Sequence, residues 1–488
     1  MVTDDRLPGL AHEAVQSVGR GNEHSPRPTE GTFPIVSPID RVEIIEIPDA
    51  GSDFATQAAD TVVGAFAAWR ATTIAERVGW LQRWAALIDE ATDDLAAIIV
   101  HEMGKPIREA RGEVAYASGF ARTHAIDIQR LDGHILPSRD PSKRLEVSYQ
   151  PVGPAVGITP WNFPAAMVMR TVAPALAAGC PIVLKPAEQT PLSALVLKEL
   201  WHRAGGPPEV FEVVPCQSPA AVGSALIDHP GMRKLTFTGS QAVGSHLYQM
   251  AAKHMMRVSM ELGGHAPFLV FEDADLDDAV AQVMGCKFRI TGQTCVCVNR
   301  VLAQESIAGE LLERLEQSFG SLVCGNPLQD ATQVGPLVDD AGFAKVVEHV
   351  DDAIAQGARV HLGGQPVGGL TYEPTLLSDV NDEMKVMREE TFGPVLPVAT
   401  FTTEDEAVER ANDSPWGLAA YLATRDLGRA HRVSERLEAG IVGVNDGIPG
   451  GDASAPFGGV KQSGVGRAGG RWGLHAYLEP QYRTLRLT

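Results

Sequence analysis

The sequence predicts an α/β protein with more than one domain, and two observations carry this prediction. The chain has 488 residues, too many for a single hydrophobic core. From Ala155 to Phe271, short apolar runs alternate with segments of helical periodicity. Strands this apolar that alternate with helices are typical of a parallel sheet covered by helices on both faces.

The elements of this region can be assigned in order. We expect strands at 155–159, 181–185, 210–214 and 234–238, and helices at 164–179, 191–204, 219–227 and 242–253. Sheets of this kind bind ligands beyond the carboxyl ends of their strands. Lys185, Glu188, Gly239 and Ser240 lie at or just past predicted strand ends, so we expect a ligand site there.

The flanking regions have other patterns. Residues 1–40 are rich in Pro, Gly, Ser and charged residues without a period, which predicts a loosely attached lead-in. From Asp53 to Glu113, apolar residues recur at intervals of three and four, as in packed helices. Residues 131–150 are typical of a projecting hairpin, and residues 477–488 alternate like a free strand that needs a partner.

Composition argues against several classes of protein. A formal charge of −20 disfavours nucleic acid or an anionic membrane as a partner. No apolar stretch approaches the ~20 residues of a membrane span and no export signal is visible, so we expect a cytoplasmic protein. Six scattered cysteines indicate reduced thiols, and no His-rich or Cys-x-x-Cys spacing indicates a metal site.

One cysteine is a candidate nucleophile. The segment Gly292-Gln293-Thr294-Cys295-Val296-Cys297 lies where an apolar helical run, Ala279 to Phe288, gives way to a β-rich one. A thiol at the end of a rigid element is well placed to attack a substrate, provided that it has nearby donors and some access. Taken alone, Cys295 and Cys297 are better explained as two small half-buried residues, as most cysteines are.

Two further motifs favour the catalytic interpretation. Asn162 stands in Thr-Pro-Trp-Asn-Phe-Pro, and Glu261 stands in Met-Glu-Leu-Gly-Gly-His. With the Cys295 motif, and with spacings of 99 (261 − 162) and 34 (295 − 261) residues, they resemble the aldehyde dehydrogenase superfamily, most closely its succinate-semialdehyde dehydrogenase branch. The resemblance extends from about Ile44 onward.

The resemblance implies the rest of the fold. It predicts a Rossmann-like parallel-sheet cofactor domain, an α/β catalytic domain and a small β extension for oligomerisation. The expected ranges are 1–130 and 151–260 for the NAD-binding domain, 261–465 for the catalytic domain, and 131–150 with 477–488 for the extension. Family members use such extensions to assemble dimers and tetramers, so a homodimer or homotetramer is expected.

The chemistry assigns a role to each motif. Cys295 would attack an aldehyde to form a thiohemiacetal, from which hydride can leave to a nicotinamide. The side-chain amide of Asn162 and the backbone N–H of Cys295 would stabilise the oxyanion, each donor contributing ~3 kcal/mol. Glu261 would activate water to hydrolyse the thioester that remains. Relatives that pass the acyl group to coenzyme A typically lack this glutamate.

The cofactor site is predicted away from the literal G-x-G-x-x-G at residues 464–469. That segment follows no clear strand and ends 19 residues (488 − 469) before the C-terminus. Gly239, Ser240 and Gly244 instead match the family's Gly-Ser-x-x-x-Gly, where a helix N-terminus can face phosphate. A simple structural turn is the alternative.

The resemblance to the family also implies residues that bind the two ends of the cofactor. Lys185 would reach the adenosine ribose, and the Glu188 carboxylate would accept hydrogen bonds from ribose hydroxyls but repel a 2′-phosphate. NAD is therefore expected, with NADP as the other possibility. Glu390 would bind the nicotinamide ribose, and the aromatic side chains that join it are Trp161 and Phe392.

The substrate prediction depends on two arginines. Arg170 and Arg289 match positions that line the family's tunnel, where they would select an aldehyde with an anionic tail. Pairing with carboxylates of the fold is the alternative. Tunnel aromatics matching Phe163 and Phe457 would pack the carbon chain, and Ser454 is a shifted candidate for a third anchor. Succinate semialdehyde is expected first, then glutarate semialdehyde, a sulfonated aldehyde or a broader range.

Three further hypotheses concern the thiols and the activity. As a strand neighbour, Cys297 would face the same side as Cys295. In some succinate-semialdehyde dehydrogenases the matching pair forms a reversible disulfide that stops activity, which makes Cys297 a candidate redox switch. A non-redox thiol hydrolase or acyl-transfer enzyme could use Cys295 and Glu261, but it would leave Lys185, Glu188 and Glu390 without a role. A binding protein that has lost activity is the third alternative.

Overall fold

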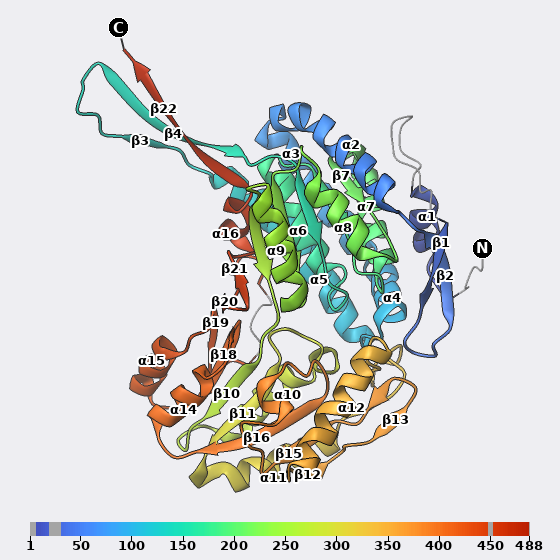
Figure 1. The fold of residues 1–488 in the computed structure, drawn as a ribbon, viewed down its shortest axis with the longest axis vertical. Coiled ribbons are helices and arrows are strands. Elements are labelled where there is room, and N and C mark those ends of the chain that lie inside the picture. Colours follow the sequence, from blue (N-terminus) through green and yellow to red (C-terminus); the bar gives the residue numbers. More distant parts are fainter. Residues whose placement is uncertain (1–5, 19–30, 448–451, 488) are drawn as a thin grey trace.

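The predicted α/β class is confirmed by a computed structural model, which describes residues 6–18, 31–447 and 452–487 (Figure 1). Its larger elements form a six-stranded sheet, a seven-stranded sheet and a three-stranded arm. The two large sheets lie in the two halves of the molecule, and the arm projects from one side.

The N-terminal region is more ordered than the sequence suggested. Among its described residues are helix α1 (Gly9–Ser17) and the antiparallel strands β1 (Thr32–Val36) and β2 (Glu43–Pro48). Phe33 and Ile35 of β1 are buried in the main core. The prediction of a loosely attached lead-in is wrong for these residues; residues 1–5 and 19–30 lie outside the described part.

Four long helices follow, as predicted. They are α2 (Ser52–Ala71), α3 (Ile74–Glu90), α4 (Thr92–Met103) and α5 (Ile107–Asp127), with a short η1 (Ile128–Arg130). A capping box between Thr73 and Glu76 fixes the start of α3. Gly104, with φ of 75°, ends α4, and α5 then packs along α3 and α6.

The six-stranded sheet has the order β21-β9-β8-β5-β6-β7. Its strands are β5 (Ala155–Ile158), β6 (Ile182–Lys185), β7 (Phe211–Val213), β8 (Lys234–Thr238), β9 (Arg257–Glu261) and β21 (Gly464–Val465). The accompanying helices are α6 (Ala166–Ala178), α7 (Pro191–Arg203), η2 (Pro208–Val210), α8 (Pro219–Asp228) and α9 (Gln241–Lys253). The predicted strands and helices are confirmed to within two residues at each end. Only β21 is antiparallel, so the discarded glycine motif begins as an edge strand of this sheet.

The seven-stranded sheet has the order β12-β15-β16-β11-β10-β18-β19 and is parallel except at β12. Its strands are β10 (Ala266–Val270), β11 (Val298–Gln304), β12 (Arg359–Leu362), β15 (Thr375–Ser378), β16 (Val395–Phe401), β18 (Ala419–Ala423) and β19 (Ile441–Val444). The helices around it are α10 (Leu276–Lys287), η3 (Arg289–Gly292), η4 (Glu305–Ile307), α11 (Ala308–Gly320), α12 (Asp340–Ala355), α13 (Lys385–Arg388), α14 (Glu404–Asn412) and α15 (Leu427–Arg436). The chain crosses from the first sheet to this one between β9 and β10, directly after Glu261.

The arm contains β3 (His134–Leu136), β4 (Lys143–Pro151) and β22 (Leu478–Arg486). The predicted hairpin is therefore present, but the C-terminal strand is not free, because β22 pairs antiparallel with β4 along its whole length (Figure 1). Smaller elements are β13 (Pro366–Gly368) with β14 (Thr371–Tyr372), β17 (Trp416–Gly417) with β20 (Val460–Lys461), and α16 (Gly470–His475). The division into three domains stays a prediction.

Candidate active site

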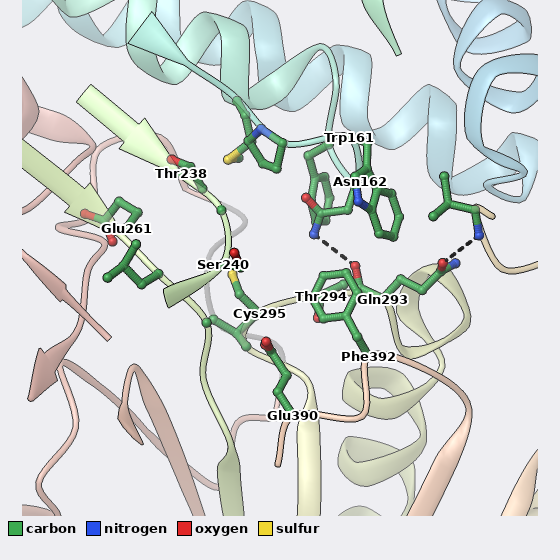
Figure 2. Close-up of a pocket in the computed structure, with 18 of the residues that line it drawn as sticks. Trp161, Asn162, Thr238, Ser240, Glu261, Gln293, Thr294, Cys295, Glu390 and Phe392 are labelled. Atoms are coloured by element: carbon green, nitrogen blue, oxygen red, sulfur yellow. Dashed lines mark hydrogen bonds between the residues drawn. The ribbon is translucent and has the colours of Figure 1, made fainter. Parts of the chain in front are cut away.

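A cavity of about 480 Å³ between the two large sheets collects the predicted catalytic residues (Figure 2). Asn162, Glu261 and Cys295 all line it, although they come from three distant segments of the chain. Most of the other predicted site residues share its wall: Trp161, Phe163, Arg170, Gly239, Ser240, Arg289, Glu390, Phe392 and Phe457. Lys185, Glu188, Gly244, Cys297 and Ser454 lie elsewhere, as described below.

The thiol of Cys295 reaches the wall through an unusual turn. After α10 ends, Ile290 and Thr291 adopt left-handed backbone conformations, with φ of 52° and 58°, and Gly292 follows with φ of 79°. These conformations are unfavourable for β-branched residues, so the surrounding contacts must impose them. A Cβ on Gly292 would lie 2.3 Å from the carbonyl oxygen of Gly393, which leaves room only for glycine. Cys295 follows at half-buried exposure.

Gln293 anchors this turn to the segment before α12. Its Nε2 donates to the carbonyl oxygens of Ile290 (3.2 Å) and Pro336 (3.4 Å), and its Oε1 accepts from the N–H of Val338 (3.0 Å). The side chain is buried, with 2% of its surface exposed. The residue two positions before the nucleophile is therefore held on both sides, which limits the movement of Cys295.

Cys297 does not face the cavity. Its N–H donates to the carbonyl oxygen of Thr294 (3.1 Å), so residues 294–297 form a turn, and β11 begins only at Val298. Its buried thiol lies against the carbonyl oxygens of Lys287 and Val298 (3.7 and 3.4 Å). The expectation that Cys297 lies in a strand on the same side as Cys295 is wrong, because two-residue alternation holds only in extended chain. The redox switch stays a prediction.

Asn162 is fixed at both of its polar ends. Its side-chain Nδ2 donates to the carbonyl oxygen of Gln293 (2.9 Å; Figure 2). Its main-chain carbonyl accepts from Lys105 Nζ (2.8 Å). The residue is buried, with 5% exposed. A carboxamide has two N–H donors, so one remains for a ligand atom in the cavity. The arrangement supplies a prepositioned donor beside the thiol.

The thiol of Cys295 is protonated in this environment. Burial raises its pKa to about 12; the nearby carboxylates of Glu390 and Glu261 add to the rise, while Arg170 opposes it. Because only a thiolate is strongly nucleophilic, attack by Cys295 requires a base that takes its proton.

Glu261 is suited to be that base. It ends β9, and its side chain is buried, with 3% exposed. Burial raises its pKa to about 8, against smaller opposing effects of Arg170, of Arg467 and of the nearby main-chain N–H of Ala468. Neither carboxylate oxygen has a hydrogen-bond partner among the described residues. A carboxylate with a pKa near neutrality and no structural bond can take up and release protons.

The phosphate-binding residues predicted for a dinucleotide lie at one edge of the six-stranded sheet. Gly239 and Ser240 follow β8 and line the cavity, and the 13-residue helix α9 begins at the next residue. The first N–H groups of a helix lack intrahelical partners and can bind phosphate. Gly244, in contrast, packs inside α9: a Cβ there would lie 2.3 Å from Leu262 Cδ2.

Lys185 and Glu188 lie at the same edge of the sheet. Lys185 ends β6, is buried, and forms an ion pair with the half-buried Glu188. β6 and β8 flank β5 in parallel, so their carboxyl ends point the same way. Parallel strand ends, a helix N-terminus and a Lys–Glu pair fit an adenosine ribose and a pyrophosphate.

The other end of such a ligand would meet Glu390. This half-buried carboxylate accepts from the N–H of Gly264 (3.1 Å), and partial burial raises its pKa to about 7. Trp161 and Phe392 lie nearby on the wall, with ring centroids 5.5 Å apart at an angle of 84°. Two aromatic rings and a hydrogen-bond acceptor on the same wall as Cys295 fit a nicotinamide riboside.

Arg170 places a cation on the cavity wall without an acidic partner. It lies in α6 with 6% exposed, and its guanidinium donates to the hydroxyl of Tyr116 (2.7 Å). The guanidinium also stacks on Phe457, 4.1 Å from the ring centroid. Among the described residues, Arg170 forms no salt bridge and its Nε has no partner. Arg170 therefore forms no salt bridge with a carboxylate in this part of the chain, although it lies near enough to Glu261 to lower the pKa of that carboxyl group.

Arg289 lies beside the same cavity. It is half-buried, and its guanidinium carbon lies 4.9 Å from the ring centroid of Phe163. It too forms no salt bridge within the described ranges. Two guanidiniums and two phenyl rings thus share the wall that also bears Cys295.

Ser454 is not brought to this wall. Its side chain is exposed, and its N–H donates to Asp452 Oδ1 (2.8 Å) within the same loop. Asp452 is exposed as well, so it does not oppose an anion in the cavity. The structure thus contradicts the expectation of a serine anchor at position 454; residues 448–451 of the loop lie outside the described part.

Sequence reasoning missed the contribution of α5. Glu109, Glu113, Tyr116 and Phe120 recur at i, i+4, i+7 and i+11, which places them on one face of a helix. Their contacts all lead to the site, because Glu109 accepts from the N–H of Ile290 (2.7 Å) and the next three reach α6. The spacing was visible in the sequence, but carboxylates on a helix usually face solvent.

Two classes of feature are missing from the part of the chain that the structure describes. It contains no group of three or more His, Cys, Asp or Glu side chains suited to hold a metal ion. None of its helices has both the length and the apolarity needed to cross a lipid bilayer.

Known proteins resemble this chain over most of its length. An NADP-dependent succinate-semialdehyde dehydrogenase of Escherichia coli K12 is 47% identical over 455 residues, which cover 93% of this chain and 94% of that protein. A 3-sulfolactaldehyde dehydrogenase of Pseudomonas putida is 48% identical (92% and 93% covered), and a glutarate-semialdehyde dehydrogenase of the same species is 46% identical (92% and 94% covered).

The fold comparison agrees with the sequence comparison. The crystal structure of an NADP-dependent enzyme of E. coli matches with a TM-score of 0.92 at 46% identity, covering 93% of this chain and 95% of that one. Residues 26–482 match the aldehyde dehydrogenase family profile. The chain therefore belongs to the aldehyde dehydrogenase family and is an oxidoreductase that acts on aldehydes.

Proposed function

We propose that the protein oxidises a short aldehyde with an anionic tail to the carboxylic acid, with NAD(P) as the hydride acceptor. The observation that carries this proposal is the buried guanidinium of Arg170, which has no acidic partner among the described residues and lines the same cavity as Cys295. A buried cation of this kind is best satisfied by an anion from the ligand. The relatives named for succinate semialdehyde, 3-sulfolactaldehyde and glutarate semialdehyde support it, since each of these aldehydes carries an acid group.

The chain's own groups supply the acyl chemistry. Glu261 takes the proton of the Cys295 thiol, whose sulfur then attacks the aldehyde carbon to give a thiohemiacetal. The free N–H of the Asn162 amide and the N–H of Cys295 bind the oxyanion, each contributing ~3 kcal/mol. A nicotinamide held beside Cys295 by Trp161, Phe392 and Glu390 would supply the acceptor for the hydride of this adduct. After losing the thiol proton to solvent, the Glu261 carboxylate activates water, which cleaves the resulting thioester and releases the acid and the Cys295 thiol.

The residues that would hold the cofactor favour NAD. Lys185 and Glu188 would face the adenosine ribose, Gly239 and Ser240 the pyrophosphate, and Glu390 the other ribose. Because Glu188 is a carboxylate, a 2′-phosphate beside it would be repelled. We therefore propose a preference for NAD, although the E. coli relative is named for NADP. A catalytic efficiency with NADP tenfold above that with NAD would contradict this preference.

Succinate semialdehyde is the proposed substrate, with glutarate semialdehyde and a sulfonated aldehyde as alternatives. A cavity of about 480 Å³ has room for a short chain between Cys295 and a guanidinium. Phe163 and Phe457 would pack against its methylene groups while the arginines bind its acid. The loss of Ser454 as an anchor leaves the chain length to be set by the two arginines.

Assembly and location are proposed from the arm and the thiols. β22 is an edge strand of a projecting sheet, with Tyr482 and Leu485 exposed, so a homodimer or homotetramer would cover it (Figure 1).

All six cysteines are free. This supports a location in the cytoplasm, where thiols stay reduced.

The substrate proposal is tested with a panel of aldehydes. Absorbance at 340 nm is followed with NAD and with NADP for succinate semialdehyde, glutarate semialdehyde, a sulfonated aldehyde and uncharged butanal. We expect kcat/KM to favour the acidic aldehydes. Arg170→Gln and Arg289→Ala should each remove roughly 10- to 100-fold of that preference, as one charged hydrogen bond of ~1.5–3 kcal/mol predicts, with butanal little affected.

The matched control is Arg122→Ala. Arg122 lies on α5 and pairs with Asp89 at the surface. Its loss should leave both the preference and the rate unchanged. If wild type prefers butanal, or if Arg122→Ala lowers the preference as much as the other two variants, the anionic-tail proposal is wrong.

A further inference from the structure

We propose that the buried ion pair between Lys105 and Glu113 is a positioning device, which fixes the Asn162 amide at the distance from Cys295 that oxyanion binding requires. The inference depends on the proposed role of Asn162 and extends it to two residues that touch neither substrate nor cofactor. It starts from the fact that both side chains of the pair are fully buried and both bond to the segment 162–166.

Lys105 holds the main chain of Asn162. It lies in the short link between α4 and α5, and its Nζ donates to the carbonyl oxygen of Asn162 (2.8 Å) and to Glu113. The ammonium also lies 4.2 Å from the ring centroid of Phe163, the next residue. A single cation thus contacts the backbone of the oxyanion donor and the side chain beside it.

Glu113 holds the other end of the same segment. Its Oε1 accepts from the N–H groups of Ala165 (2.8 Å) and Ala166 (3.0 Å), at the start of α6. A carboxylate at this end of a helix also interacts favourably with the helix dipole. With its other oxygen bonded to Lys105, Glu113 joins the beginning of α6 to the carbonyl of Asn162. The pair clamps the segment at residues 162, 165 and 166.

The position of this clamp bears directly on the nucleophile. The Asn162 side chain donates to the carbonyl oxygen of Gln293, two residues before Cys295. Movement of the Asn162 main chain would therefore displace the amide relative to the thiol. A misplacement of about 1 Å in a catalytic group can lower the rate by ~10²-fold.

Stability alone is a weak explanation for the pair. Burial lowers the pKa of Lys105, which shows that the ammonium is costly to bury. Replacing a buried ion pair with well-packed apolar residues is often neutral or stabilising, whereas removing one partner is destabilising. Apolar side chains could fill the same space, but they could not form the hydrogen bonds that fix the main chain of residues 162–166.

A second contact of α5 supports the same function. Glu109, one helical turn before Glu113, accepts from the N–H of Ile290, in the turn that leads to Cys295. One face of α5 therefore holds both the oxyanion donor segment and the nucleophile turn. The distance between the Asn162 segment and the turn before Cys295 is set by the four-residue spacing of two carboxylates on one rigid helix.

The variants separate position from stability. Glu113→Gln places an amide N–H₂ opposite the ammonium, so Lys105 loses its acceptor and Asn162 loses a fixed donor. Lys105→Met removes the donor directly. The double variant Lys105→Met/Glu113→Leu removes both charges and leaves no uncompensated buried charge, so its Tm should fall less than that of either single variant.

The matched control is Glu102→Gln. Glu102 is equally buried and also caps a helix, since it accepts from the N–H groups of Leu192 and Ser193 at the start of α7. It makes no contact with residues 162–166. If capping a helix were all that mattered, this variant would lose as much activity as Glu113→Gln.

Three measurements on the full-length enzyme form the test. We expect Glu113→Gln and the double variant to lower kcat by roughly 10- to 100-fold, with the aldehyde KM within about threefold and Glu102→Gln near wild type. Alkylation of Cys295 by iodoacetamide should stay within about twofold in every variant, because that reaction develops no oxyanion. Equal losses of kcat and alkylation rate would mean general damage to the site and would overturn the proposal.

The decisive comparison is with Asn162→Ala. This variant should lower kcat by ~10²–10³-fold, and in its background Glu113→Gln should add less than about a twofold loss. Full additivity would overturn the positioning role and leave the role of Asn162 intact. An Asn162→Ala enzyme with normal kcat would overturn the oxyanion role itself, and with it this inference.

Discussion

The two sides of the cavity differ in how tightly their polar groups are held. On one side, Asn162 is bonded through its amide to Gln293 and through its carbonyl to Lys105. On the other side, the carboxylate of Glu261 has no hydrogen-bond partner among the described residues, and burial raises its pKa to about 8. Figure 2 shows Asn162 and Glu261 on different sides of Cys295.

The difference follows from what each group must do. A donor that stabilises charge has to be in place before the charge develops, so every bond that fixes Asn162 lowers the reorganisation needed in the transition state. A general base has to change its protonation state during each turnover, and hydrogen bonds to the charged form would depress its pKa. One buried site can therefore contain a rigid side, where hydrogen bonds fix Asn162, and a titratable side, where Glu261 is left without them.

The largest effect is expected where both sides meet, at the thiol. Cys295→Ala should lower kcat by roughly 10⁴-fold or more, because no thiohemiacetal can form without the thiol, even when Asn162 and Glu261 are in place. Steady-state turnover of succinate semialdehyde measures this loss. Cys297→Ala is the control, and its rate should stay within about threefold, since its thiol faces away from the cavity. A larger loss in Cys297→Ala than in Cys295→Ala would show that Cys297, and not Cys295, is the nucleophile.

The next effect concerns the titratable side. Glu261→Gln should lower kcat by about 10²–10⁴-fold, the usual contribution of a general base. In wild type, the base is active when deprotonated, so kcat should rise as pH increases through about 8 and then level off. The variant should lack this rise. A pH profile of kcat measures both, and an unchanged rise in Glu261→Gln would assign the titration to another group.

A smaller effect is expected at the adenosine end, far from both sides. Glu188→Ser should shift the ratio of kcat/KM for NADP over NAD upward by roughly tenfold, because one partly screened repulsion of about 1–2 kcal/mol is removed. Glu188→Asp retains the charge and should leave the ratio near wild type. Equal shifts in the two variants would show that shape, and not charge, sets the preference.

The smallest effect is expected for Ser454, which lies outside both sides. Because its side chain is exposed and away from the cavity wall, Ser454→Ala should change kcat/KM for succinate semialdehyde by less than about twofold. A loss above tenfold would return this serine to the substrate site.

The sequence predicted the parts of this site that local pattern determines. The strands of the six-stranded sheet are apolar runs between helices, and Asn162, Glu261 and Cys295 stand in recognisable motifs. Cys297 was misplaced because residues 294–297 form a turn and β11 begins only at Val298, so the two-residue alternation of a strand does not apply to the two cysteines.

The other misses have similar causes. Strand β1 was not predicted because Pro34 and its polar surroundings gave no strand period, although Phe33 and Ile35 alternate as buried residues. Lys105 and Glu113 were missed because charged residues are seldom fully buried, and only the folded chain shows that each is the other's partner.

The central claim is that the rigid side stabilises the oxyanion, whereas the titratable side moves protons, first from the Cys295 thiol and then from water. Rapid mixing of enzyme, NAD and succinate semialdehyde, followed at 340 nm, measures the rate of the first turnover at each pH. We predict that this rate rises with pH through about 8 in wild type, that Asn162→Ala lowers the rate but keeps the rise, and that Glu261→Gln lowers the rate and abolishes the rise. If both variants keep the same dependence on pH, the two sides do not have separate roles and the account is contradicted.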